Sequence, residues 1–506
     1  MRKLALLLLL PFVASCGSPI VFRAYQNPEI STSYSSKKGE GYETLKEYVP
    51  IATQGGNLPD SYSSIYNNGN RFSLPSLGRQ KLLVIPVDFQ EYPGEAEEIE
   101  TISHAFFGQN DADAFPSVAE YFDRSSYSHF QLEGRVAPSW FRSSQYSYAD
   151  LSSVYGSKRT EQTLQKIYLE ALEWYDATYP DSPHSEYAYS DGHGHQVVPV
   201  YFIYRAPYAA EGNRSSMLWA FSVSSPAPIS WSSYSMLRTS KGVDSHTLIH
   251  ETGHLLGFPD LYDTNDSVSS GRVSPCGHGD MMDGSLGDEN PFFKLLMGWI
   301  KPMVARGKGE VILHQFVSNG DCLLLKSHYS DSLFDEYVLL DFYTPSSLNG
   351  FDANRRKGAL NRMVRKSGVR AYRVDARLGL FSSSGASEPL TSNSDLTGKQ
   401  IGFYAFNSQG YESNGYIEGA NPLLQWLDAS SSSAKLRSYF VASDANKTIQ
   451  QNGYEYQCRD VLFQKGRGFE GDAFSDLRFS SGNVGYSWKA EEVGSTFARV
   501  SFQPTP

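Results

Sequence analysis

The stretch H-E-T-G-H at positions 250–254 constrains this chain more than any other. Two histidines four residues apart lie on one face of an α-helix, where both imidazoles can bind the same metal ion. Glu251 directly follows the first histidine and is close enough to reach a water molecule on that ion. Apolar residues before and after the stretch, such as Leu248 and Leu255, predict a buried helix.

The end of this helix indicates a third ligand. Gly257 tolerates the left-handed backbone with which many helices end, and Pro259 prevents the helix from continuing. The reversal brings Asp260 back toward His250 and His254. The full pattern, H-E-x-x-H-x-x-G-x-x-D, resembles the extended motif of metzincin peptidases, with Asp in place of a third histidine.

Two nitrogen ligands and one oxygen ligand beside a glutamate favour zinc over magnesium or calcium. We therefore predict one catalytic Zn²⁺, held by His250, His254 and Asp260, with Glu251 as the general base. Glu289 is an alternative third ligand. The alternative is a buried helix that binds no metal, in which both histidines hydrogen-bond to backbone carbonyls. The Glu251 carboxylate would then be buried without a cation nearby, which costs free energy.

Four further features allow two interpretations each. In G-D-M-M-D-G, at positions 279–284, Met282 is the candidate for a methionine turn beneath the metal, with Met281 as the alternative; two methionines can also simply fill the core. Cys276 is either a thiolate ligand or a buried structural cysteine. The acidic residues at 260, 263 and 266 either bind a structural Ca²⁺ or form a solvated loop, and His193 and His195 are either ligands or solvated loop residues.

The first 15 residues have the pattern of a lipoprotein signal peptide. Arg2 and Lys3 precede an apolar run at 4–14 that is too short for an ordinary membrane span. The run ends at Cys16, in a context that resembles the bacterial lipobox, so we expect lipidation of Cys16 and anchoring to the cell envelope. The alternative is an ordinary secretory signal. Both predict export.

Composition limits the partners. The chain has 44 basic and 55 acidic residues, which gives a net charge of -11. This charge argues against binding to nucleic acid and against electrostatic binding to a membrane surface. An N-terminal lipid is the only membrane contact we expect. Cys276, Cys322 and Cys458 remain besides Cys16, and their spacing does not decide a disulfide. The oligomeric state is equally undetermined.

The 506 residues suggest several domains. We predict a tether or propeptide-like segment at 16–79 and a catalytic domain at 80–305. A β-rich accessory region follows at 306–506, as one unit or as two subdomains, with a Ser-rich insertion at 380–440. Within the catalytic domain the expected strands are 81–89, 131–136 and 197–204, and the expected helices are 118–127, 160–175 and 292–300. Pro86 suggests an edge or an irregularity in the first strand.

Several segments resemble the immune inhibitor A family of secreted zinc metallopeptidases. They are L-V-I-P-V-D-F at 83–89, S-V-A-E-Y-F at 117–122, the motif running on through P-D-L-Y-D at 259–263, M-G-W-I at 297–300, E-Y-V-L-L-D at 336–341 and G-V-R-A-Y-R-V-D at 368–375. The resemblance implies a zincin-like α/β (α+β) catalytic domain, a β-sandwich-like accessory region, and hydrolysis of peptide bonds in extracellular polypeptides.

The chain departs from that family at two positions. Gly279 stands where an aromatic residue often precedes the Asp of the methionine turn. Gly284 stands where some metzincins carry a Tyr that helps to stabilise the oxyanion. The alternative to a peptidase is a catalytically silent, zincin-fold surface adhesin.

Overall fold

The computed structural model describes residues 36–49, 51–53, 56–58, 74–110, 114–152, 158–190, 196–207, 218, 220–223, 229–238, 242–262, 275–354, 365–381, 387–396, 399–407, 422–429, 439–441, 448–451, 454–470, 479, 482 and 484–505. The predicted signal peptide and Cys16 lie outside these residues. Among the described helices, none has the length and apolar character needed to cross a membrane.

The N-terminal half is built on a mixed sheet with the strand order β10-β11-β9-β5-β6. Its strands are β5 (Gly78–Asp88), β6 (Phe130–Val136), β9 (Gln196–Tyr204), β10 (Phe221–Val223) and β11 (Ile229–Ser235). Four of them are parallel, and β10 pairs antiparallel with β11 at one edge. The predicted strands 81–89, 131–136 and 197–204 are confirmed.

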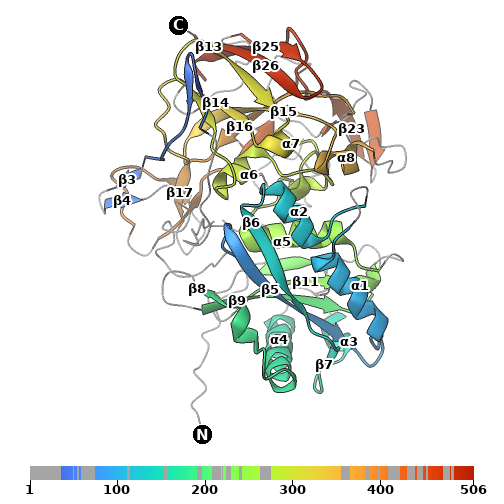
Figure 1. Ribbon diagram of the computed structural model, residues 1–506. Coiled ribbons are helices and arrows are strands. Elements are labelled where there is room, and N and C mark those ends of the chain that lie inside the picture. The colour runs from blue at the N-terminus through green and yellow to red at the C-terminus, as the bar shows by residue number, and fades with distance from the viewer. Residues whose placement is uncertain are drawn as a thin grey trace.

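Helices cover both faces of this sheet because β5 and β9 carry apolar residues on both sides. Leu83 and Phe202 pack with α4 (Lys158–Thr178) in one core. Leu82 and Tyr201 face the opposite core, which contains α1 (Ala96–Phe107), α2 (Val118–Ser125) and α5 (Ser245–Leu256). Figure 1 shows α4 on the other side of the sheet from these three helices. The amphipathic pattern at 160–175 thus correctly predicted a helix.

Pro86 does not mark an edge, because β5 lies between β9 and β6. The pairing of β5 with β6 ends at Val84, and its pairing with β7 (Phe141–Arg142) begins at Val87. Pro86 therefore lies where one partner strand has ended and the next has not begun. A residue without an N–H group disturbs the ladder least in such a gap, so the predicted irregularity is confirmed.

The C-terminal half contains a second large sheet, with the order β1-β2-β12-β14-β15-β16-β20. Its strands are β1 (Lys38–Gly39), β2 (Tyr42–Thr44), β12 (Met303–Ala305), β14 (Cys322–Leu325), β15 (Glu336–Tyr343), β16 (Gly368–Asp375) and β20 (Leu424–Trp426). One face packs on a smaller sheet made of β13 (Gly309–His314), β24 (Gly468–Phe469), β25 (Tyr486–Val493) and β26 (Phe497–Pro504).

The other face of the large sheet joins the core of the N-terminal half. Leu339, Tyr372 and Trp426 belong to the same buried cluster as Leu248 of α5 and Phe293 of α6 (Pro291–Leu296). A continuous apolar core therefore connects the two halves, with the N-terminal half drawn below the C-terminal half in Figure 1.

Two predicted boundaries differ from the structure. Residues 38–44 fall in the predicted tether, yet β2 pairs with β12 and so extends the C-terminal sheet. β20 falls in the predicted Ser-rich insertion, yet it pairs with β16. Strands of two or three residues carry too little periodicity to be found in a sequence. The zincin and β-sandwich assignments themselves remain predictions.

The remaining elements are short. They are β3 (Ile51–Thr53), β4 (Gly56–Leu58), α3 (Tyr148–Ser152), β8 (Tyr189–Ser190), α7 (Phe316–Asn319), α8 (Leu348–Ala353), β17 (Leu378–Phe381), β18 (Ser387–Pro389), β19 (Gln400–Phe403), β21 (Tyr439–Val441), β22 (Thr448–Gln451) and β23 (Tyr454–Arg459), with 3-10 turns at His184–Tyr187, Met236–Arg238 and Met281–Asp283.

Candidate metal centre

Helix α5 carries the H-E-T-G-H stretch in its last two turns. It ends at Gly257, whose φ of 103° is left-handed, as the glycine at this position predicted. The N–H groups of Gly257 and Phe258 bond back to the carbonyls of His254 and Gly253, at 3.0 and 2.9 Å. This reversal turns the chain under the helix and places Asp260 beside the two histidines.

His250, His254 and Asp260 converge on one point. One ligand atom from each lies within 4.8 Å of the others. The Nε2 atoms of His250 and His254 are 3.1 and 3.4 Å from the same Oδ1 of Asp260. Among the described residues, this is the group of three His, Cys, Asp or Glu side chains with the geometry to hold a metal ion.

The orientation of both imidazoles fits a cation at that point. Nδ1 of His250 lies 3.2 Å from the carbonyl oxygen of Met281, and Nδ1 of His254 lies 2.7 Å from that of Phe258. Since a carbonyl oxygen only accepts hydrogen bonds, each Nδ1 carries a hydrogen. In the neutral ring each Nε2 then presents a lone pair toward the Asp260 carboxylate, and three lone-pair donors need a proton or a metal ion between them.

The electrostatics agree with this arrangement. Burial lowers the pKa of His254, but the Asp260 carboxylate outweighs this effect and raises that pKa to about 9. Burial favours the protonated form of Asp260, but His254 and His250 outweigh it and hold the pKa of Asp260 below its usual value. Without metal, protons thus neutralise the site, and a metal ion would displace them.

Glu251 is buried beside this group, and two serines surround it. Ser222 on the edge strand β10 places its Oγ 3.0 Å from Oε2 of Glu251 and 2.8 Å from its carbonyl oxygen. Ser232 on β11 hydrogen-bonds to the Ser222 hydroxyl. Burial raises the pKa of the Glu251 carboxyl, while the nearby histidines and Ser222 oppose the shift. A glutamate in such surroundings has the properties of a general base.

Met282 lies beneath α5. A Cβ added at Gly253 would come 2.7 Å from Sδ of Met282, so helix and methionine are in close contact at a glycine. The carbonyl of Met281 holds His250, and Asp280 accepts a hydrogen bond from the N–H of Met282 at 3.1 Å. The two methionines therefore have different roles. The backbone carbonyl of Met281 orients His250, and the side chain of Met282 packs against helix α5.

The alternative ligands lie elsewhere. Glu289 is buried among Asp280, Asp288 and Lys294 and does not belong to the His250 group. Cys276 is a buried free thiol whose Sγ lies 3.7 Å from the carbonyl of Leu424, as expected of a structural cysteine.

Other histidines, cysteines and acidic residues have no part in the group or are not described. His246, one turn before His250, bonds to the carbonyl of Ser285 at 2.8 Å. Cys322 is a buried free thiol. Asp263, Asp266, His193 and His195 lie outside the described residues, as does the side chain of Cys458. The proposed Ca²⁺ loop is therefore not tested.

Ser222 was not predicted from the sequence, because it lies 29 residues before Glu251 in a strand of three residues. Tyr262 was also not singled out. Its ring stacks beside that of His250, with 6.5 Å between centroids. Its place directly after the Asp260 reversal was the one available signal.

No family model and no curated protein matches this chain. Among solved structures, it is similar to a catalytically inactive OgpA from Akkermansia muciniphila in complex with an O-glycopeptide (glycodrosocin) substrate. The two share 10% identity with a TM-score of 0.24, over 78% of this chain and 94% of that chain. Values this low assign neither fold nor function.

Proposed function

We propose that this chain is an exported, zinc-dependent endopeptidase that hydrolyses peptide bonds of extracellular proteins. One observation carries the proposal: the Nε2 atoms of His250 and His254 converge with the Asp260 carboxylate, beside a buried Glu251. Export, and a lipid anchor at Cys16, are part of the proposal on the strength of the N-terminal sequence alone.

His250, His254 and Asp260 would hold the ion. When bound, zinc supplies Lewis-acid activation of a water molecule and of the substrate carbonyl. Glu251 accepts the proton of the attacking water and passes it to the leaving amine as the C–N bond breaks. The Ser222 hydroxyl, 3.0 Å from Oε2 of Glu251, can donate its one hydrogen to that oxygen and orient the carboxylate.

The test compares the purified full-length protein with Glu251→Gln. We expect about one zinc ion per chain in both, measured by elemental analysis. We also expect casein cleavage to fall by at least about 100-fold in the variant, the usual contribution of a general base. Glu173→Gln, at an exposed glutamate of α4, is the matched control and should retain full activity. A folded protein without zinc, or an active Glu251→Gln variant, contradicts the proposal.

A further inference from the structure

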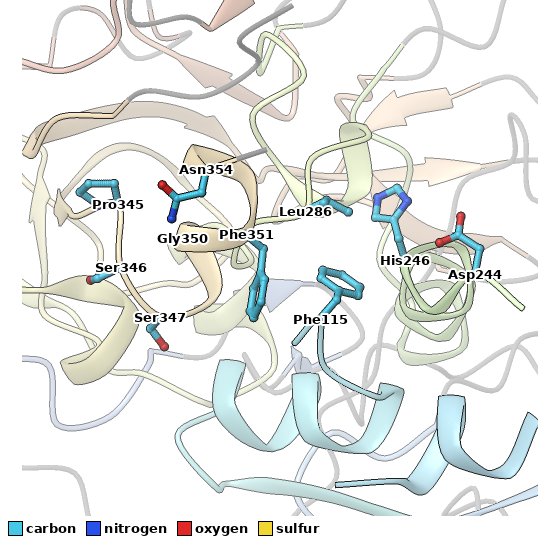
Figure 2. Close-up of a pocket in the computed structure, with 10 residues that line it drawn as sticks. All are labelled: Phe115, Asp244, His246, Leu286, Pro345, Ser346, Ser347, Gly350, Phe351 and Asn354. Carbon is cyan, nitrogen blue, oxygen red and sulfur yellow. The ribbon is translucent and has the colours of Figure 1, made fainter. Parts of the chain in front are cut away.

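A cavity of 620 Å³ lies beside the first turn of α5. Its walls come from the start of α5, the chain after the Met281–Asp283 turn, the residues before α2, and the α8 region of the C-terminal half (Figure 2). The lining residues are Phe115, Asp244, His246, Leu286, Pro345, Ser346, Ser347, Gly350, Phe351 and Asn354.

Buried contacts hold these walls together. The hydroxyl of Ser285 bonds to the carboxylate of Asp352 in α8, and its carbonyl bonds to His246 in α5. The N–H of Asp288 donates to Oδ1 of Asn349, also in α8, at 3.1 Å. The cavity is thus a fixed feature of the fold, and one of its walls belongs to the C-terminal half.

The cavity is close enough to the metal centre to contact the same substrate. His246 lines it and lies four residues before His250 in α5, a rise of about 6 Å along the helix. An extended peptide advances about 3.3 Å per residue. A side chain one or two residues away from the reacting peptide bond would therefore reach the cavity.

The lining favours a large, neutral, aromatic side chain. The rings of Phe115 and Phe351 meet edge to face with 5.4 Å between centroids, and Figure 2 shows them adjacent in the cavity wall. Leu286 adds apolar surface. Asp244 is the acidic lining residue, and the Arg124 guanidinium brings a positive charge to the lining, since it lies over the Phe351 ring, 5.8 Å from the centroid, and donates to the Ser347 hydroxyl at 3.2 Å. A bound aromatic ring would extend the edge-to-face cluster.

Polar groups complete the lining. The hydroxyls of Ser346 and Ser347 and the amide of Asn354 can bond to a phenol or indole. The volume falls within the range of about 300–1,000 Å³ typical of ligand sites and exceeds that of any single side chain, so even tryptophan fits.

We propose that this cavity is a substrate-recognition subsite for a Phe, Tyr or Trp side chain within two residues of the cleaved bond. The proposal rests on the peptidase function proposed above. It makes α8 of the C-terminal half a determinant of specificity.

Gly350 offers a direct test. It lines the cavity, and a Cβ added there meets nothing closer than 3.8 Å, so a larger side chain can enter without displacing backbone. In Gly350→Trp the indole would fill the cavity. Gly350→Ala makes the same loss of glycine with little added volume and is the matched control. The zinc content and the melting temperature of both variants report whether they fold. Phe351→Ala, which removes an aromatic ring from the cavity wall, tests the subsite independently.

Cleavage of a mixed peptide library, read by mass spectrometry, gives the first result. We expect Phe, Tyr and Trp to be enriched within two residues of the cut for the parent and for Gly350→Ala. The enrichment should fall at least tenfold in Gly350→Trp, with cleavage beside small residues retained, and it should weaken in Phe351→Ala. Absence of aromatic enrichment in the parent, or enrichment unchanged in Gly350→Trp, overturns the subsite.

Binding to the Glu251→Gln variant separates the two proposals. N-acetyl-phenylalanine amide should bind more tightly than N-acetyl-alanine amide, by ligand-observed NMR, and Gly350→Trp should abolish the difference. A protein that cleaves nothing but binds the aromatic amide at this cavity overturns the peptidase and retains the subsite. A protein that cleaves peptides but discriminates in neither assay overturns the subsite alone.

Discussion

At the scale of single residues, the Ser222 hydroxyl lies 3.0 Å from Oε2 of Glu251 and helps to fix the position of that carboxylate. We expect Ser222→Ala to lower kcat by about tenfold or more, because a hydrogen bond to a charged group contributes about 1.5–3 kcal/mol. KM and zinc content should change little, since Ser222 touches neither the ligands nor the cavity. Steady-state kinetics with elemental analysis would measure this.

Ser235→Ala is the matched control for that variant. Ser235 is also a buried serine, but its hydroxyl donates to the carbonyl of Leu218 at 2.7 Å. Ser222→Thr keeps the hydroxyl and should recover part of the lost rate. Equal losses in Ser222→Ala and Ser235→Ala would mean that Ser222 has only a structural role.

Zinc affinity should depend on pH through His254. In the metal-free protein its pKa is about 9, so below pH 9 zinc must displace a proton from this ring. The apparent affinity should fall as the pH decreases below 9, by up to about tenfold per unit for each displaced proton. Competition with a zinc chelator between pH 6 and 9 would measure the slope. An affinity that is flat over this range would contradict the assigned ligands.

Residues within one helix and its reversal could be predicted from the sequence, because helix periodicity and the glycine turn fix their relative positions locally. The convergence of His250, His254 and Asp260 is of this kind. Ser222 could not be predicted, because its contact with Glu251 depends on how strand β10 packs against α5.

At the scale of elements, the contact between α5 and the Met281–Asp283 turn can be tested through Gly253. An added methyl group would approach Sδ of Met282 to 2.7 Å. We therefore expect Gly253→Ala to lower the free energy of unfolding by about 1–3 kcal/mol, as overpacking does. This sign is the opposite of the usual effect of Gly→Ala within a helix.

Chemical denaturation of Gly253→Ala, Met282→Ala and the double variant forms a cycle that isolates the contact. The double variant should be more stable than the sum of the two losses predicts. Strictly additive losses would show that Met282 does not pack against Gly253.

The same turn explains one departure from the resembled family. The indole of Trp426 in β20 occupies the space next to Gly279, where an added Cβ would lie 2.7 Å from the ring. An aromatic side chain at 279 would collide with Trp426. The sequence shows a glycine at 279 but not why a larger residue is excluded there. The residue that excludes it, Trp426, lies 147 positions later and comes into contact only in the folded chain.

At the scale of the whole molecule, the two halves share one apolar core. Leu339, Tyr372 and Trp426 of the large C-terminal sheet pack in the same cluster as Leu248 of α5. Buried charges lie at the same junction: Lys294 pairs with Asp288 at 2.5 Å and lies over the ring of Phe316, 4.9 Å from its centroid.

We expect a fragment that ends at residue 302 to fail to fold, because it would expose the apolar surface of α6 that packs against β15 and the rest of the core that the two halves share. Circular dichroism, thermal melting and zinc content of this fragment beside the full-length protein would measure the effect. A soluble fragment with one zinc ion and a cooperative melt would show that the C-terminal half is an independent domain, as the sequence alone suggested.

Six elements of the N-terminal half could be predicted from their apolar patterns, namely β5, α2, β6, α4, β9 and α5, whereas the helix α1 and the strand β11 were not predicted. The assembly of the C-terminal half could not be predicted. Its large sheet collects β1 and β2 from the start of the chain and β20 from a serine-rich stretch, and pairings over such separations leave no local pattern.

The most direct measurement is X-ray absorption at the zinc edge on the purified full-length protein, together with His254→Ala and Asp260→Ala. We predict two imidazole nitrogens and a carboxylate oxygen at about 2.0–2.2 Å, with an open position for water. Each variant should lose its own ligand and most of the bound zinc. A zinc ion coordinated by sulfur, or a spectrum unchanged in both variants, would contradict the site and the peptidase function built on it.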